Sequence, residues 1–193
     1  PTFNIEGSLV VASGATFPSN ATVNFDGAYT GGNTSVNAPG ITFNLVTINR
    51  TISTSYTRTF TIAANTTIPL GNSPTITLNN TSDYYHLTNN GTMTVSGGTG
   101  LTINVKGDFT NNGTLTANTI TTLTMNGSIV NSGTISLTSA TTLDFNTYGN
   151  YIASYTGNSG SSLLTASSPT FNIEGSLVVA SGATFPSNAT VNF

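Results

Sequence analysis

The apolar residues of this chain alternate with Thr, Asn and Ser, and between positions 101 and 145 the alternation returns every twenty residues. A shift of twenty places Ile103 on Leu123 and then on Leu143, and it places Leu115 on Ile135. Alternation with period two is typical of half-buried strands, and Gly and Asn between them suit turns with a left-handed backbone. Three short strands per coil of about 20 residues, repeated in tandem, indicate a β-solenoid. We therefore predict an all-β chain folded as a parallel β-helix.

A longer repeat encloses the short one. Residues 1–25 recur without change as residues 169–193, so Pro169 is equivalent to Pro1. We divide the chain into one full unit, residues 1–168, and the start of the next, residues 169–193. Because the chain starts and stops inside the repeat, we expect it to belong to a longer polypeptide whose partners include further copies of the repeat. We assign eight apolar pairs, and hence about eight coils of about 21 residues and a rise of about 38 Å, to each unit: Phe3/Ile5, Val23/Phe25, Phe43/Leu45, Phe60/Ile62, Ile76/Leu78, Ile103/Val105, Leu123/Met125 and Leu143/Phe145.

The less regular coils carry Gly-rich stretches that we interpret as insertions at turns. These are residues 31–33, 38–40, 96–100 and 157–168. Insertions in solenoids usually map to loops on one face, which is often the binding face. Aromatic residues gather in two further segments, residues 84–86 and 148–155, and they are the candidates for surface binding to a carbohydrate or a cell surface: Tyr84, Tyr85, Tyr148, Tyr151 and Tyr155. Packing of these tyrosines over the rim of a coil is the interpretation that we favour.

Charge is scarce, and this narrows the classes of function. The chain has three basic residues, six acidic residues, one His and no Cys. Nucleic-acid binding requires a basic surface, so we expect no nucleic acid as partner. The acidic residues do not cluster with a base or with further metal ligands, and we predict a protein that is not an enzyme and has no cofactor or metal. No apolar run is long enough for a membrane span, and no signal peptide opens the chain.

Two polar columns follow from the short repeat. Asn89, Asn111 and Asn131 align, and we predict that their amides form a ladder of hydrogen bonds from coil to coil. Thr-x-Thr or Thr-x-Ser steps align beside them at Thr92, Thr114 and Thr134. Such a hydroxyl array resembles the flat faces of ice-binding solenoids, but the other coils interrupt it, so ice binding is a lesser alternative.

Asn-x-Ser/Thr sequons occur ten times, yet 25 Asn in a chain with 61 Ser and Thr among 193 residues would give about eight by chance. The motif is therefore weak evidence for N-glycosylation. The candidate sites are Asn20, Asn33, Asn49, Asn65, Asn79, Asn80, Asn90, Asn112, Asn126 and Asn188.

Coils of about 20 residues with Asn-x-Gly-Thr steps resemble the repetitive β-helical shafts of large secreted adhesins, such as filamentous haemagglutinin. The resemblance implies a right-handed parallel β-helix and an extracellular location. We predict a structural protein: a secreted, tandem-repeat filament that serves as an adhesin shaft or a biofilm matrix fibre, in contact with neighbouring fibres, cell surfaces or glycans. The alternatives are a carbohydrate-binding module and a polysaccharide-degrading β-helix. A string of β-sandwich domains is the alternative fold.

Overall fold

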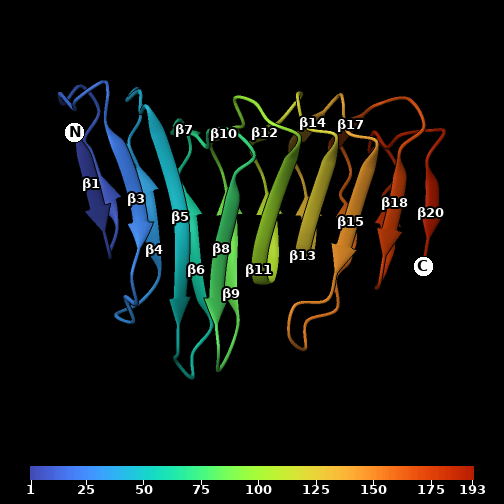
Figure 1. Ribbon diagram of the computed structural model, residues 1–193, viewed down its shortest axis with the longest axis horizontal. Helices are drawn as coiled ribbons and strands as arrows, with labels where there is room; N and C mark the ends of the chain where they lie inside the picture. Colours follow the sequence, from blue (N-terminus) through green and yellow to red (C-terminus); the bar gives the residue numbers. More distant parts are fainter.

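The computed structural model describes all residues 1–193 and consists of twenty β-strands and connecting segments, without a helix. The strands pair in parallel with strands of neighbouring coils, and the result is an elongated β-solenoid of about eight turns (Figure 1). In Figure 1 the front strands run downward and the chain returns behind them while it advances from left to right, which is a right-handed winding. The predicted fold is confirmed.

The strands form three walls. Wall 1 consists of β1 (Thr2–Ile5), β3 (Thr22–Asp26), β5 (Leu45–Ile52), β8 (Thr75–Asn80), the first halves of β11 (Gly100–Asn111) and β13 (Thr122–Asn131), β15 (Thr142–Asn146), β18 (Thr170–Ile173) and β20 (Thr190–Asn192). Wall 2 consists of β2 (Leu9–Val10), β4 (Thr34–Asn37), β6 (Arg58–Ile62), β9 (Tyr85–Asn89), the second halves of β11 and β13, β16 (Tyr155–Gly157) and β19 (Leu177–Val179). Wall 3 consists of β7 (Thr67–Pro69), β10 (Thr92–Thr94), β12 (Thr114–Thr116), β14 (Thr134–Leu137) and β17 (Ser162–Thr165).

The register of wall 1 shows how the turns divide between the two repeats. Thr2 pairs with Thr22, whereas Thr142 pairs with Thr170, so the sequence offset from coil to coil is not constant. Seven such steps carry the chain from β1 to β18, and Thr2 and Thr170 are equivalent residues of successive repeats. The start of the next repeat supplies the remaining turn. One repeat thus contains seven coils, whereas we predicted about eight. The coils are therefore longer on average than the predicted length of about 21 residues.

Two of the apolar pairs were assigned to the wrong place. Val23 pairs with Val46 instead of Phe43, because this coil is three residues longer than twenty. Phe60 and Ile62 belong to wall 2, where Phe60 meets Phe25 of wall 1 across the core at 5.0 Å between ring centroids. A fixed shift along the sequence cannot distinguish two walls that both alternate with period two.

The insertions gather at the corner between walls 1 and 2, although only one of the four predicted stretches lies there. The excursions are residues 27–33, 53–57, 81–84 and 147–154, and Figure 1 shows several of them below the wall 1 strands. In β11 and β13 the chain turns this corner without an excursion, at a single glycine with positive φ, which is Gly107 in β11 and Gly127 in β13. Residues 157–168 are not an insertion, since they contain β17 of wall 3.

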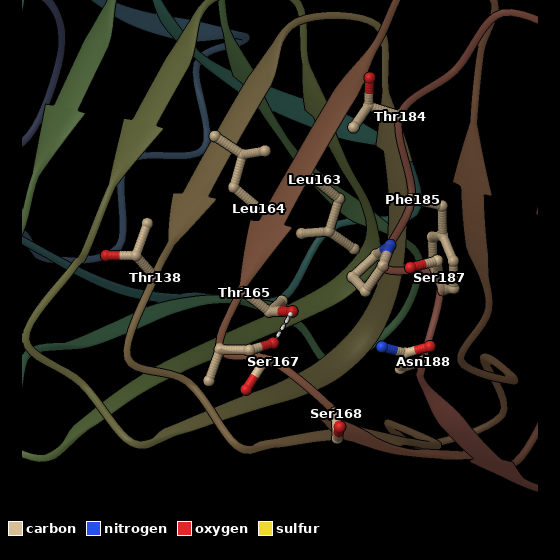
Figure 2. Close-up of a pocket in the computed structure, with 12 residues that line it drawn as sticks. Thr138, Leu163, Leu164, Thr165, Ser167, Ser168, Thr184, Phe185, Ser187 and Asn188 are labelled. Carbon is tan, nitrogen blue, oxygen red and sulfur yellow. Dashed lines mark hydrogen bonds between the residues drawn. The ribbon is translucent and has the colours of Figure 1, made fainter.

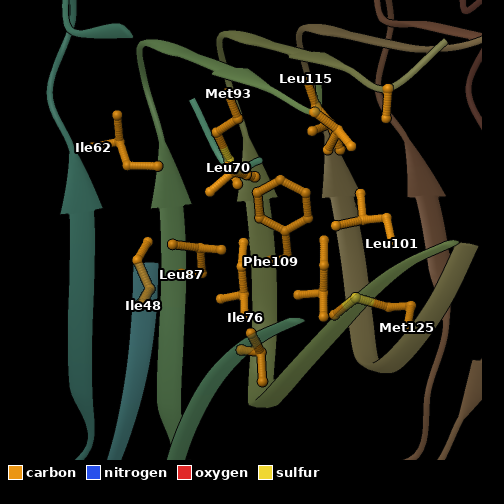
Figure 3. Packing of buried hydrophobic residues seen from close by; sticks show 14 of the residues in the cluster. Ile48, Ile62, Leu70, Ile76, Leu87, Met93, Leu101, Phe109, Leu115 and Met125 are labelled. Atoms are coloured by element: carbon orange, nitrogen blue, oxygen red, sulfur yellow. The ribbon is translucent and has the colours of Figure 1, made fainter. Parts of the chain in front are cut away.

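The core is a rod of forty buried apolar residues that runs along the whole solenoid. Figure 3 shows part of it, with side chains from different coils piled in files. Met93, Leu115 and Ile135 of wall 3 are fully buried, whereas Thr114 and Thr116 on either side of Leu115 point outward and are half-buried. The inward and outward assignment made from the alternation is therefore confirmed for these strands.

Candidate functional site

Asn89, Asn111 and Asn131 form a buried ladder at the corner between walls 2 and 3. Asn89 Nδ2 donates to Asn111 Oδ1 at 2.8 Å, and Asn111 Nδ2 donates to Asn131 Oδ1 at 2.9 Å. Each Nδ2 also donates to a backbone carbonyl of wall 3 at 3.0–3.2 Å, on Thr114, Thr134 and Ser162 respectively. The three side chains are fully buried. They satisfy polar groups of the turn that would otherwise be buried without partners, and they offer no surface to a ligand.

The glycine two residues after each ladder Asn is required by the same corner. A Cβ built on Gly113 would lie 2.0 Å from the carbonyl oxygen of Gly91, and one on Gly133 would lie 2.1 Å from that of Gly113. Such distances exclude any side chain. The Asn-x-Gly-Thr step therefore lets the chain turn closely over the coil below, and it serves the architecture of the solenoid.

A second ladder, which we call the outer ladder, lies on the outward face of wall 1. Asn24 Nδ2 donates to Asn4 Oδ1 at 2.9 Å, and Asn126 Nδ2 donates to Asn104 Oδ1 at 2.6 Å. The outer ladder occupies two neighbouring columns. The links Thr47–Asn24, Asn172–Asp144 and Asn192–Asn172 belong to the column of Asn24, whereas Asn146–Asn126 belongs to the column of Asn126, two residues further along each strand. Sequence analysis missed this ladder. Its signal is the Thr-x-Asn ending that recurs in the strands of wall 1.

Two of the five candidate surface tyrosines lie inside the core, which corrects the prediction for them. Tyr85 and Tyr155 are each only 1% exposed. Their hydroxyls reach polar partners, with Tyr85 OH 3.4 Å from Thr34 Oγ1 and Tyr155 OH accepting from Asn131 Nδ2 at 3.5 Å. Both tyrosines occupy inward positions of wall 2 strands, so their phenol rings add to the apolar core.

The other three tyrosines are near one corner, where the excursion 147–154 folds back on itself. Tyr148 and Tyr151 exchange two backbone hydrogen bonds, at 3.0 and 3.1 Å. The Tyr151 hydroxyl donates to Asp108 Oδ1, and the Tyr151 ring meets that of Tyr84 edge to face at 5.2 Å between centroids. Tyr84 is 39% exposed. We call Tyr84, Tyr151, Asp108 and His86 the Tyr84 cluster.

His86 and Asp108 give the Tyr84 cluster its polar groups. The backbone N–H of Asp108 donates to His86 Nδ1 at 2.9 Å, which requires the imidazole to carry its proton on Nε2. The carboxylate oxygen Oδ2 lies 3.7 Å from the same nitrogen and forms no ion pair while the imidazole is neutral. Beside this cluster, Lys106 donates to the carbonyls of Asn80 and Thr81 and borders a hollow of about 290 Å³. No group of three or more His, Cys, Asp or Glu in the chain could hold a metal ion.

Wall 3 carries two larger hollows, and they bound its threonine array. One, of about 400 Å³, lies between β17 and residues 184–188 and is lined by Leu164, Phe185 and several hydroxyls (Figure 2). The other, of about 420 Å³, lies between residues 40–43 and β7. Neither hollow has a charged residue in its lining. Outward pairs of hydroxyls are confined to β10, β12 and β14, because Pro69 and Leu164 occupy the corresponding outward positions in β7 and β17.

The ten sequons differ in their exposure. Asn80 is fully buried, and its amide bonds within the excursion 53–57, so the prediction of a glycan there is wrong. Asn79 and Asn126 are half-buried on wall 1, and Asn126 belongs to the outer ladder. The remaining seven side chains are exposed, and glycosylation at them stays a prediction: Asn20, Asn33, Asn49, Asn65, Asn90, Asn112 and Asn188.

Buried tyrosines make the solenoid sensitive to strong alkali. Burial raises the pKa of Tyr155 from 10.0 to about 12, and burial together with the bond to Asp108 raises the pKa of Tyr151. The folded chain therefore holds these phenol protons at a pH where the unfolded chain has lost them. The two protonated tyrosines contribute fully to the free energy of unfolding below pH 10, and this contribution is lost progressively as the pH rises above 10. Because one pKa unit corresponds to about 1.4 kcal/mol, we expect the free energy of unfolding to fall by about 2–3 kcal/mol between pH 10 and pH 12 through the shifted pKa of Tyr155.

Urea denaturation at pH 8, 10 and 11.5 measures this loss. Tyr155→Phe, which keeps the ring and removes the phenol proton, should show a smaller loss over the same range. An identical loss in the wild-type chain and in this variant would contradict the assignment.

No helix of the chain is long and apolar enough to cross a membrane. Comparisons with protein-family models, with curated proteins and with solved structures found no match to the chain.

Proposed function

We propose that this chain is a structural repeat of a secreted, extracellular filament, a stiff β-solenoid shaft of an adhesin or of a biofilm matrix. The observation that carries the proposal is the behaviour of the repeated segment. Residues 1–25 pair β1 with β3 at a shift of twenty, and residues 169–193 pair β18 with β20 at the same shift. The same sequence thus forms the same coil at both places.

The two copies of this segment make complementary contacts with the rest of the repeat. The first copy pairs forward, with β5 through β3 and with β4 through β2. The second copy pairs backward, with β15 through β18 and with β16 through β19. Because one sequence makes both sets of contacts, repeats joined in tandem continue the walls across every junction. A continuous shaft then exposes no strand edge along its length.

The coils are joined strongly enough to make the shaft stiff. The chain forms 109 backbone–backbone hydrogen bonds, and most of them link one coil to the next. The apolar core and the two Asn ladders run in the same direction as these bonds. In such an array the stability is a sum over coils and over contacts between neighbouring coils, so it grows with the number of repeats.

Electron microscopy of chains with one, two and three repeats tests the proposal. We expect rods of constant diameter that lengthen by about 34 Å per repeat, which is seven steps of about 4.8 Å. Separate globules, or an increment far from this value, would contradict the continuous shaft. Antibody labelling of intact native cells tests the extracellular location, which labelling only after lysis would contradict.

A second function, carbohydrate binding, is favoured by the Tyr84 cluster alone. The exposed ring of Tyr84 stands edge to face with Tyr151, and the Asp108 carboxylate and the His86 imidazole lie beside them. Aromatic faces next to hydrogen-bonding groups suit the apolar and hydroxyl faces of sugars. Glycan binding that disappears in Tyr84→Ala would support this function, and glycan binding that is unchanged in this variant would refute a role for the cluster.

A further inference from the structure

The outward face of wall 1 is the most regular surface of the molecule. Nine strands follow one another along it without interruption, from β1 to β20. Wall 3, by comparison, has no strand in the first two coils, and wall 2 is bordered by the excursions. In Figure 1 the excursions extend past the ends of the wall 1 strands and leave the front of this wall open.

Most side chains on this face are small and polar, and they are in register. The central column contains only Asn and Thr apart from one Asp, and it consists of Asn4, Asn24, Thr47, Thr75, Thr102, Thr124, Asp144, Asn172 and Asn192. Thr and Asn also dominate the columns on either side of it, for example at Thr122, Thr142, Thr170, Asn104 and Asn126. The outer ladder holds many of these side chains in fixed positions.

We propose that the outward face of wall 1 is a lateral interface on which a second copy of the shaft lies side by side with the first. This inference rests on the proposed function, because it needs a continuous shaft. A second copy has the same spacing of about 4.8 Å between strands, so the two faces match over any length. Ladders of Asn and other small polar side chains mate as dry, interdigitated sheets in cross-β assemblies. The carboxylates of the face lie toward its two ends, at Asp26 and Asp144 within the strands and at Glu6 and Glu174 directly after β1 and β18. The wall 1 strands from β5 to β13 carry no outward carboxylate, so charge does not oppose the contact along this middle part.

The area of the face predicts a dependence on length. Nine strands at about 4.8 Å, each contributing about 14 Å along the chain, give a face of roughly 600 Å². A stable pair of proteins usually needs about 800 Å² per partner. One repeat is therefore too short for stable pairing, whereas two or more repeats exceed the requirement. The contact accumulates with repeat number, which suits long filaments that bundle.

The test compares two charge variants in chains of three repeats. The first variant carries Thr102→Lys and Thr124→Lys in every repeat, which places two neighbouring cations on wall 1. The matched control carries Thr88→Lys and Thr110→Lys, which are neighbours on wall 2. All four threonines are half-buried and alternate with inward apolar residues, so they point outward. Sedimentation velocity measures pairing, and electron microscopy measures the diameter of the rods.

We expect the wild-type chain and the wall 2 control to pair, and the wall 1 variant to remain single, with its dissociation constant raised at least tenfold. Pairing of the wall 1 variant should return in 1 M salt, where the screening length is about 3 Å. Equal pairing of both variants, or wild-type rods that stay single at every concentration, would overturn the inference while leaving the single shaft intact. Wild-type chains that form no rods would refute the proposed function itself.

The same variants distinguish another occupant of the face. The wild-type three-repeat chain and both variants are sedimented with microcrystalline cellulose. If the wild-type chain and the wall 2 control bind the cellulose and the wall 1 variant does not, the face binds a crystalline polysaccharide. Together with an absence of pairing between chains, that result would overturn the assignment to a second copy.

Discussion

Replacing Leu115 by Asp is expected to lower the free energy of unfolding by more than about 4 kcal/mol, because it buries a carboxylate without a partner. Leu115 is fully buried in wall 3, between Met93 of the preceding coil and Ile135 of the following one. No basic side chain lies in these three strands. The variant therefore loses the apolar contacts of Leu115 and cannot neutralise the new charge.

Thr116→Asp is the matched control for this substitution. Thr116 is the next residue along the same strand, but it points outward between Thr94 and Ser136 and is half-buried. Its carboxylate would remain in water, so we expect a change of less than about 1 kcal/mol. Urea denaturation followed by far-ultraviolet circular dichroism measures both variants. Equal tolerance of the two substitutions would remove the inward and outward assignment of wall 3.

Arg50 is the second residue on which a large effect is expected, because it is a cation buried in the core of the first three coils. Its side chain is fully buried, between the rings of Phe25 and Phe60 at 5.6 and 5.5 Å from their centroids. Its guanidinium donates to the carbonyl oxygens of Ile5 and Gly7 at 2.9 and 2.8 Å. It also donates to Thr34 Oγ1 at 3.0 Å.

The bonds to Ile5 and Gly7 connect coils that are not neighbours. Arg50 belongs to β5 in the third coil, whereas Ile5 and Gly7 belong to the first. The second coil lies between them, but its wall 1 strand ends at Asp26 and residues 27–33 form an excursion at the corner. The guanidinium of Arg50 spans this corner and so reaches the first coil. Arg50 thus satisfies carbonyls that the regular pattern of strand pairing leaves without partners.

We expect Arg50→Met to lower the free energy of unfolding by about 3–5 kcal/mol, because it leaves buried acceptors unpaired. Arg58→Met is the control, since Arg58 is half-buried, bonds the Thr30 carbonyl at 3.1 Å and lies over Tyr56. Loss of this surface contact should cost less than about 1 kcal/mol. Urea denaturation measures the difference, and hydrogen exchange in β1 should accelerate only in Arg50→Met. Similar effects of both substitutions would contradict the role of Arg50.

Much of the regular part of the structure was predictable from local sequence. The alternation around Leu115 assigns the inward face correctly, and shifts of 22 and of twenty residues place the Asn ladder correctly, because these coils contain no excursion. The prediction failed where coils differ in length. Phe43 and Phe60 were placed on wall 1 because each has an apolar residue two positions further on, which is a pattern that every wall shares.

The candidate sites were less predictable, for the same reason. Tyr85 and Tyr155 stand in segments that look like insertions, yet they are strand residues with inward side chains. The Tyr84 cluster joins Tyr84, Asp108 and Tyr151, which are far apart in the sequence and meet only because of the lengths of the intervening coils. No local pattern marks such a meeting.

The sequence alone determined that this chain is a parallel β-solenoid built from an exact long repeat, because alternation with period two and recurrence are local properties that dictate which side chains face inward. Only the tertiary structure decided that seven coils make one repeat, that Arg50 links the first coil to the third, and that wall 3 lacks a strand in the first two coils. These features depend on register between strands, and register is set by the lengths of excursions and by contacts between distant residues.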